Sequence, residues 1–114
     1  MQKDTFLTSK KTIENFKLIR VLKSFSALEW KRFGRFVQSP YHNTNQSLIK
    51  FYEVLKKRFP FEEVDDLEQE RLFKKVYKKE KFNAAKFQNL CSNLYGLVED
   101  FIIDAQLQED KRNY

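Results

Sequence analysis

A nucleophile–histidine pair would have to place His42, the one histidine of the chain, beside Cys91, a serine or a threonine. Such chemistry needs an imidazole beside a thiol or hydroxyl to accept its proton. Cys91 falls on the apolar side of a long helical pattern, where a thiol behaves as a small core residue and its thiolate is disfavoured. His42 follows Tyr41 in a segment rich in turn residues, where we expect it to be exposed or packed in the loop. We therefore predict no catalytic residue and no enzyme.

Carboxylates concentrate in residues 62–70, which hold six acids and no base. Carboxylate catalysis needs acids held in a cleft with altered pKa values, and a calcium loop needs Asp, Asn and Gly at fixed spacing. Neither pattern is present, so we predict a solvated connector, with Asp65 and Glu68 at the spacing of a capping box. A lone cysteine also excludes zinc sites of the Cys₄ and Cys₂His₂ kinds. We predict no metal, no cofactor and no small-molecule substrate.

Basic side chains recur at helical spacing on two stretches of a chain with 22 Lys+Arg, 16 Asp+Glu and a net charge of +6. The candidate phosphate contacts are Lys31, Arg32 and Arg35 on the first stretch and Arg71, Lys74, Lys75 and Lys78 on the second. The first three expected helices loosely resemble a helix-turn-helix, but the connection over residues 39–45 exceeds its usual turn of ~3–4 residues. Nucleic-acid binding is therefore the alternative hypothesis, and solvated lysine faces are the simpler interpretation.

Apolar residues recur every three or four positions along the chain, and no stretch alternates as a strand does. The 12 Phe, 5 Tyr and 1 Trp follow the same spacing, which favours a core over a stacking platform for single-stranded nucleic acid. We predict an all-α fold, a compact bundle of about five helices with a long C-terminal helix. The helices are expected over residues 13–24, 27–38, 46–59, 67–79 and 84–110.

The second expected helix has the strongest local signal. Ser26 and Glu29 have the spacing of a capping box, in which each side chain accepts a hydrogen bond from the other residue's backbone. Phe25 and Trp30 flank it at the spacing of a hydrophobic staple. The other expected caps are Thr12 for the first helix, Thr44 or Asn45 for the third and Asn83 for the fifth.

A further pattern consists of residues 22–33, 36–43 and 72–77, followed by Asn83 and by the long expected helix through Leu90 and Phe101. Together they resemble the amino-terminal region of a family of large, uncharacterised bacterial proteins. The resemblance covers about residues 16–105 and implies a shared helical fold. It implies no catalytic residue, because the family has no assigned activity. Its members look longer than this chain, which implies a fragment or a stand-alone version.

Ile103 and Leu107 interrupt the polar side of the last expected helix. At 100° per residue they point about 160–200° away from Phe87 on the apolar side, and they lie among the acids Asp100 and Asp104. Two aliphatic residues one turn apart predict a small adhesive strip that contacts a second copy, another protein or the following segment of a longer chain. The exposed aromatic residue Tyr41 is the next candidate for a partner contact.

We expect residues 1–11 to form a polar arm and residues 12–110 a single helical domain. No apolar run approaches the ~20 residues of a membrane span, and the first residues lack the apolar region of a secretory signal. These features predict a cytoplasmic protein without a membrane partner. The predicted function is a non-catalytic helical module for protein–protein interaction or scaffolding, through a protein partner or self-association.

Overall fold

The computed structural model describes residues 12–13, 15–62 and 67–112, with side chains as far as Leu107. The described residues contain five α-helices and no strand, which confirms the predicted all-α fold. The helices are α1 (Lys17–Lys23), α2 (Ala27–Gln38), α3 (Gln46–Lys56), α4 (Gln69–Val76) and α5 (Ala84–Arg112). Among the described helices, none is long and apolar enough to span a membrane.

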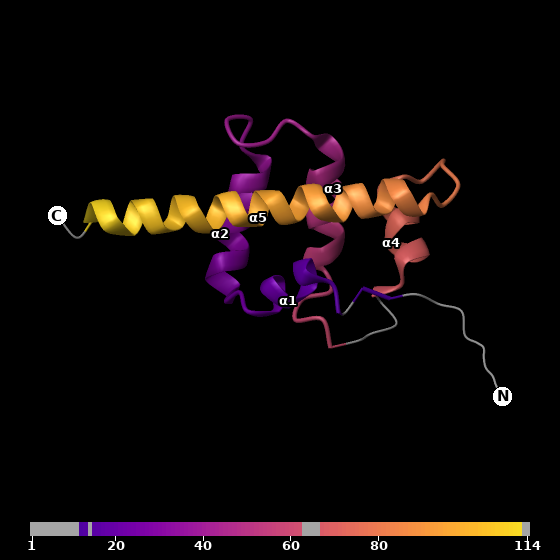
Figure 1. The fold of residues 1–114 in the computed structure, drawn as a ribbon, viewed down its shortest axis with the longest axis horizontal. Coiled ribbons are helices and arrows are strands. Elements are labelled where there is room, and N and C mark those ends of the chain that lie inside the picture. The colour runs from indigo at the N-terminus through magenta and orange to yellow at the C-terminus, as the bar shows by residue number, and fades with distance from the viewer. Residues whose placement is uncertain (1–11, 14, 63–66, 113–114) are drawn as a thin grey trace.

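Helix α5 is the spine of the molecule. Its 29 residues extend over roughly 44 Å at the α-helical rise of about 1.5 Å per residue. It packs against α1, α2 and α3, and α3 also packs against α2 and α4. In Figure 1, α4, α3 and α2 cross behind successive parts of α5, whose C-terminal part continues beyond α2. One end of α5 therefore projects from the bundle.

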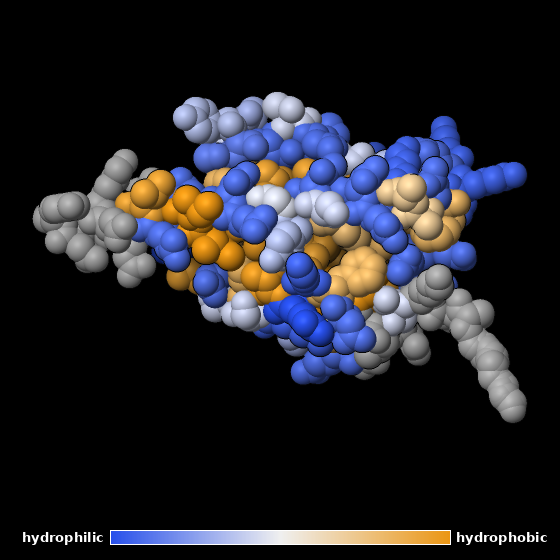
Figure 2. All heavy atoms as spheres, in the orientation of Figure 1, coloured by the Kyte–Doolittle hydropathy of each residue, from blue (hydrophilic) through white to orange (hydrophobic). Residues whose placement is uncertain are grey.

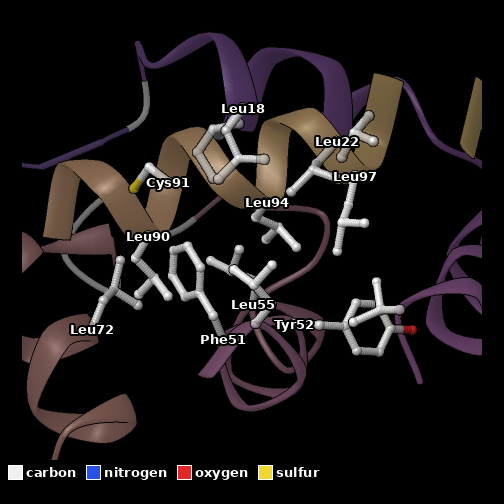
Figure 3. Packing of buried hydrophobic residues seen from close by; sticks show 14 of the residues in the cluster. Leu18, Leu22, Phe51, Tyr52, Leu55, Leu72, Leu90, Cys91, Leu94 and Leu97 are labelled. Atoms are coloured by element: carbon white, nitrogen blue, oxygen red, sulfur yellow. The ribbon is translucent and has the colours of Figure 1, made fainter. Parts of the chain in front are cut away.

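The core lies between α5 and the shorter helices. Leu90 and Leu94 of α5 point toward Phe51 and Leu55 of α3 (Figure 3), and all four side chains are buried. The largest fully buried aromatic side chains are Tyr52, Phe33, Phe51, Phe73 and Phe87. The helical spacing of the aromatic residues thus reflects core packing, as predicted.

Helix α1 begins later than predicted. The expected helix over residues 13–24, capped by Thr12, is wrong at its start, because α1 begins at Lys17. Thr12 instead forms an isolated antiparallel bridge with Glu68, and the Ile13 N–H donates to the Leu67 carbonyl over 3.0 Å. Ile13 is fully buried in this extended segment. The backbone groups that a helix would have used are therefore paired with a distant part of the chain.

The same bridge accounts for the late start of α4. The prediction placed the start at Leu67, but the helix begins at Gln69, and the side chain of its N-cap, Glu68, makes no capping hydrogen bond. Asp65, the predicted partner of Glu68, lies outside the described residues. The helix also ends at Val76 and not at residue 79, because Tyr77 has φ −117° and ψ 73°, outside the helical region.

Local capping signals in the sequence correspond closely to the structure. The Glu29 N–H donates to Ser26 Oγ over 3.1 Å, and the Ser26 N–H donates to Glu29 Oε1 over 2.7 Å, forming the predicted capping box. Phe25 meets Trp30 edge-to-face with ring centroids 6.1 Å apart. At α3, Asn45 is the cap, since its Oδ1 accepts from the Ser47 N–H.

The ends of α3 and α5 differ from the predicted bounds. Helix α3 stops at Lys56, and residues 57–60 form turns where the prediction extended the helix to 59. Helix α5 is capped as predicted, because Asn83 Oδ1 accepts from the Lys86 N–H over 3.0 Å. It continues to Arg112, two residues beyond the predicted end.

Candidate interaction surface

Ile103 and Leu107 are exposed on the projecting part of α5. Their side chains are 56% and 55% exposed, whereas Phe101 just before them is 8% exposed and buried against the bundle. Figure 2 shows apolar atoms gathered over this part of α5. The prediction that the two aliphatic residues lie off the core stripe is confirmed. The buried stripe of α5 ends at Phe101, since Ala105, one turn later, is exposed.

Acidic side chains accompany the two aliphatic residues. Asp100 is exposed one turn before Ile103 and two turns before Leu107, and Asp104, between Ile103 and Leu107, is half-buried. At 100° per residue, these four side chains occupy an arc of about 100° on α5. We refer to Asp100, Ile103, Asp104 and Leu107 as the α5 strip. The strip combines apolar surface with negative charge, and its Ile103 points about 200° away from Phe101 around α5.

A second exposed surface lies on α2. Leu28 is 55% exposed, and Lys31, Arg32 and Arg35 are exposed beside it. These residues stand three, four and seven positions after Leu28, so all four share an arc of about 100°. We refer to Leu28, Lys31, Arg32 and Arg35 as the α2 face. The sequence analysis found its basic residues but missed Leu28, which is the large aliphatic residue on the basic side of the helix.

A pocket of about 470 Å³ lies where α2 meets α5. Its lining comprises Arg32, Arg35 and Phe36 from α2, Phe101, Asp104 and Ala105 from α5, and Ser39 and His42 from the connection after α2. Within the described part of the chain, neither Arg32 nor Arg35 forms an ion pair. Although Asp104 lines the same pocket, the two guanidinium groups therefore remain available to an anion brought by a ligand.

The second set of predicted phosphate contacts lies on α4, apart from the first (Figure 1). Arg71 Nε is 3.4 Å from Glu68 Oε2, and Lys74 Nζ donates to the Glu80 carbonyl over 2.8 Å. Lys75 and Lys78 are exposed. The α4 set is therefore partly used within the chain.

Tyr41 is the most exposed large apolar side chain among the described residues, at 90%. It meets His42 edge-on at 5.0 Å, and His42 stacks on Phe36 with ring centroids 3.9 Å apart. The buried Asn43 holds the loop, because its Nδ2 donates to the Val37 carbonyl over 2.8 Å. His42 is exposed and stacks on Phe36 of α2, in line with the prediction that it is exposed or packed in the loop. Tyr41 is held at the surface by the same connection.

Cys91 and His42 are not brought together. Cys91 is buried on the side of α5 that faces α1 and lines a pocket with Phe16 and Tyr95, whereas His42 lines the pocket between α2 and α5. Burial raises the pKa of the Cys91 thiol to about 12, so the thiol is protonated at neutral pH. Cys91 is a core residue, as the sequence predicted.

Among the described residues, no three His, Cys, Asp or Glu side chains are grouped as a metal site would require. No protein family, curated protein or solved structure matches the chain. The predicted relationship to large bacterial proteins stays a prediction.

Proposed function

We propose that this protein is a non-catalytic helical module that binds another protein through the α5 strip. The observation that carries the proposal is the exposure of Ile103 and Leu107 side by side on a helix end that projects beyond α2. Single exposed aliphatic residues are common on protein surfaces and need no partner. Two of them one turn apart on a projecting helix provide a face on which a second helix or groove can pack.

The energetics favour a modest but specific contact. Fully burying an aliphatic side chain contributes about 1.5–3 kcal/mol relative to leaving it exposed, and both residues are already about half-buried. The neighbouring carboxylates of Asp100 and Asp104 keep the free surface hydrated. They also favour a partner with basic groups at the edge of its contact, because charge complementarity raises the association rate and selects partners.

The test compares partner capture by three matched forms of the chain. The parent, the variant Ile103→Glu, Leu107→Lys and the control Tyr41→Ser are immobilised at equal density. We expect a partner retained by the parent and the control to be lost from the α5 variant, whose helical dichroism should be unchanged. Equal retention by all three forms would show that the α5 strip is not the binding surface.

Nucleic-acid binding is the second candidate, and Arg32 and Arg35, which form no ion pair among the described residues, favour it. Exposed guanidinium groups can contact phosphates, and such binding weakens steeply with salt. The internal contacts of the α4 set oppose this candidate, since Arg71 and Lys74 already contact Glu68 and the Glu80 carbonyl. Salt-dependent retention on heparin that Arg32→Gln, Arg35→Gln abolishes would support nucleic-acid binding. If the Arg32→Gln, Arg35→Gln variant is retained as strongly as the parent, these two arginines do not form a nucleic-acid-binding site.

A further inference from the structure

The α5 strip and the α2 face are complementary in character. Three of the four large hydrophobic side chains exposed in the described residues, Leu28, Ile103 and Leu107, lie on these two surfaces. On α2 the aliphatic residue stands among three cations, and on α5 the two aliphatic residues stand beside two carboxylates. Each surface thus offers the charge that the other lacks.

Within one molecule the two surfaces adjoin at the pocket between α2 and α5, where Asp104 of the strip lies with Arg32 and Arg35 of the face. The aliphatic residues of the strip are not covered by this arrangement. Ile103 lies about 200° from Phe101 around α5 at 100° per residue, and both Ile103 and Leu107 are exposed. A second molecule is therefore needed to cover Ile103 and Leu107.

We propose that the α5 strip of one copy binds the α2 face of a second copy of this chain. This inference rests on the proposed function and identifies its partner. In the contact, Ile103 and Leu107 pack on Leu28 while Asp100 lies among Lys31, Arg32 and Arg35. A symmetric pairing of two α5 strips is disfavoured, because it would bring the carboxylates of Asp100 and Asp104 from both copies together.

The contact joins two different surfaces, so one copy contributes its strip and the other contributes its face. A single contact of two helix faces lies below the roughly 1,200 Å² of a standard stable interface. We therefore expect association that is weak, depends on protein concentration and decreases with salt. Neither the C-terminal part of α5 nor the exposed side of α2 needs to change conformation when the contact forms, since both are already helical and uncovered.

Sedimentation equilibrium on surface variants tests the proposal. The face variant is Arg32→Glu, Arg35→Glu, and the strip variant is Ile103→Glu, Leu107→Lys. We expect the parent to self-associate and each variant alone to associate at least about tenfold more weakly. A one-to-one mixture of the two variants should recover dimers, because the intact strip of the face variant can bind the intact face of the strip variant.

The control variant is Lys74→Glu, Lys75→Glu, which makes the same charge change on α4 and should associate like the parent. If the face variant does not fold, Leu28→Glu replaces it and is expected to give the same result. Monomers in the mixture, or a parent that stays monomeric at millimolar concentration, would overturn the proposal. In that case, capture of another protein that depends on the α5 strip would leave the proposed function standing.

Discussion

The phenol ring of Tyr52 on α3 packs directly against the backbone of Gly34 on α2. A β-carbon at position 34 would lie 2.7 Å from Tyr52 Cζ, closer than real β-carbon contacts. The Tyr52 hydroxyl also donates to the Trp30 carbonyl over 2.8 Å. Gly34 therefore sets the distance between α2 and α3, which fixes the orientation of the α2 face on the bundle.

The close approach of Tyr52 to Gly34 predicts that replacement by alanine changes the stability of the protein in opposite directions at Gly34 and at Gly96, the two glycines of the chain. In a helix, Gly→Ala gains up to about 1 kcal/mol of intrinsic propensity, but Gly34→Ala must displace Tyr52, and overpacking costs about 1–3 kcal/mol. We expect Gly34→Ala to lower the free energy of unfolding. Gly96→Ala meets no atom within 4 Å and should raise it by about 0.5–1 kcal/mol. Urea unfolding of both variants measures the effects, and a stabilising Gly34→Ala would contradict the packing described.

The capping box of α2 should contribute measurably to stability. Ser26→Ala removes the acceptor of the Glu29 N–H, and we expect a loss of about 1 kcal/mol in the free energy of unfolding. Because the two hydrogen bonds belong to one motif, the losses from Ser26→Ala and Glu29→Ala should not add. Thermal or urea unfolding of the two single variants and the double variant gives the coupling. Strict additivity would indicate that the two hydrogen bonds act independently.

Trp30 should tolerate replacement by another ring far better than truncation. It is 5% exposed and contacts the rings of Phe25, Tyr52 and Phe59. Trp30→Ala should cost about 3–5 kcal/mol. The buried Nε1 has no hydrogen-bond partner among the described residues, so Trp30→Phe removes an unpaired donor. We expect it to cost about 1–2 kcal/mol by urea unfolding. Equal losses for the two variants would contradict this account.

Burial of Cys91 predicts a loss of stability in alkaline solution. Its pKa is raised from 9.0 to about 12 in the fold, so above pH 9 the unfolded chain loses a proton that the folded chain keeps. Stability therefore falls as the pH rises between these two values. Between pH 8 and 10, the free energy of unfolding should fall by about 1.4 kcal/mol more for the parent than for Cys91→Ala. Parallel pH profiles for the two proteins would show that the thiol is accessible to water.

Features encoded by neighbouring residues could be predicted from the sequence. The pairing of Ser26 with Glu29 and the Asn83 cap depend on residues three positions apart, and the exposure of Ile103 follows from its phase on one helix. The bridge between Thr12 and Glu68 joins segments far apart in the chain, and the apolar spacing of Ile13 is equally compatible with a helix. The start of α1 was therefore predicted wrongly.

The candidate surfaces were likewise only partly predictable. The phase of α5 identified Ile103 and Leu107 without knowledge of any other helix. Leu28 has the helical phase of Lys31, Arg32 and Arg35, so its exposure could also have been predicted from the sequence, although it was not. The pocket that brings Arg35 and His42 together could not be predicted, because its walls come from two helices and a connection.

The most direct test of the central claim is light scattering of the parent and the variant Ile103→Glu, Leu107→Lys over a range of concentrations. We expect the mass of the parent to rise with concentration, and the variant to stay monomeric with an unchanged helical spectrum. The control Tyr41→Ser should behave like the parent. A variant that associates as the parent does would place the contact elsewhere, with the Tyr41 loop as the next candidate. A variant that unfolds would show that Ile103 and Leu107 belong to the core, which contradicts the account.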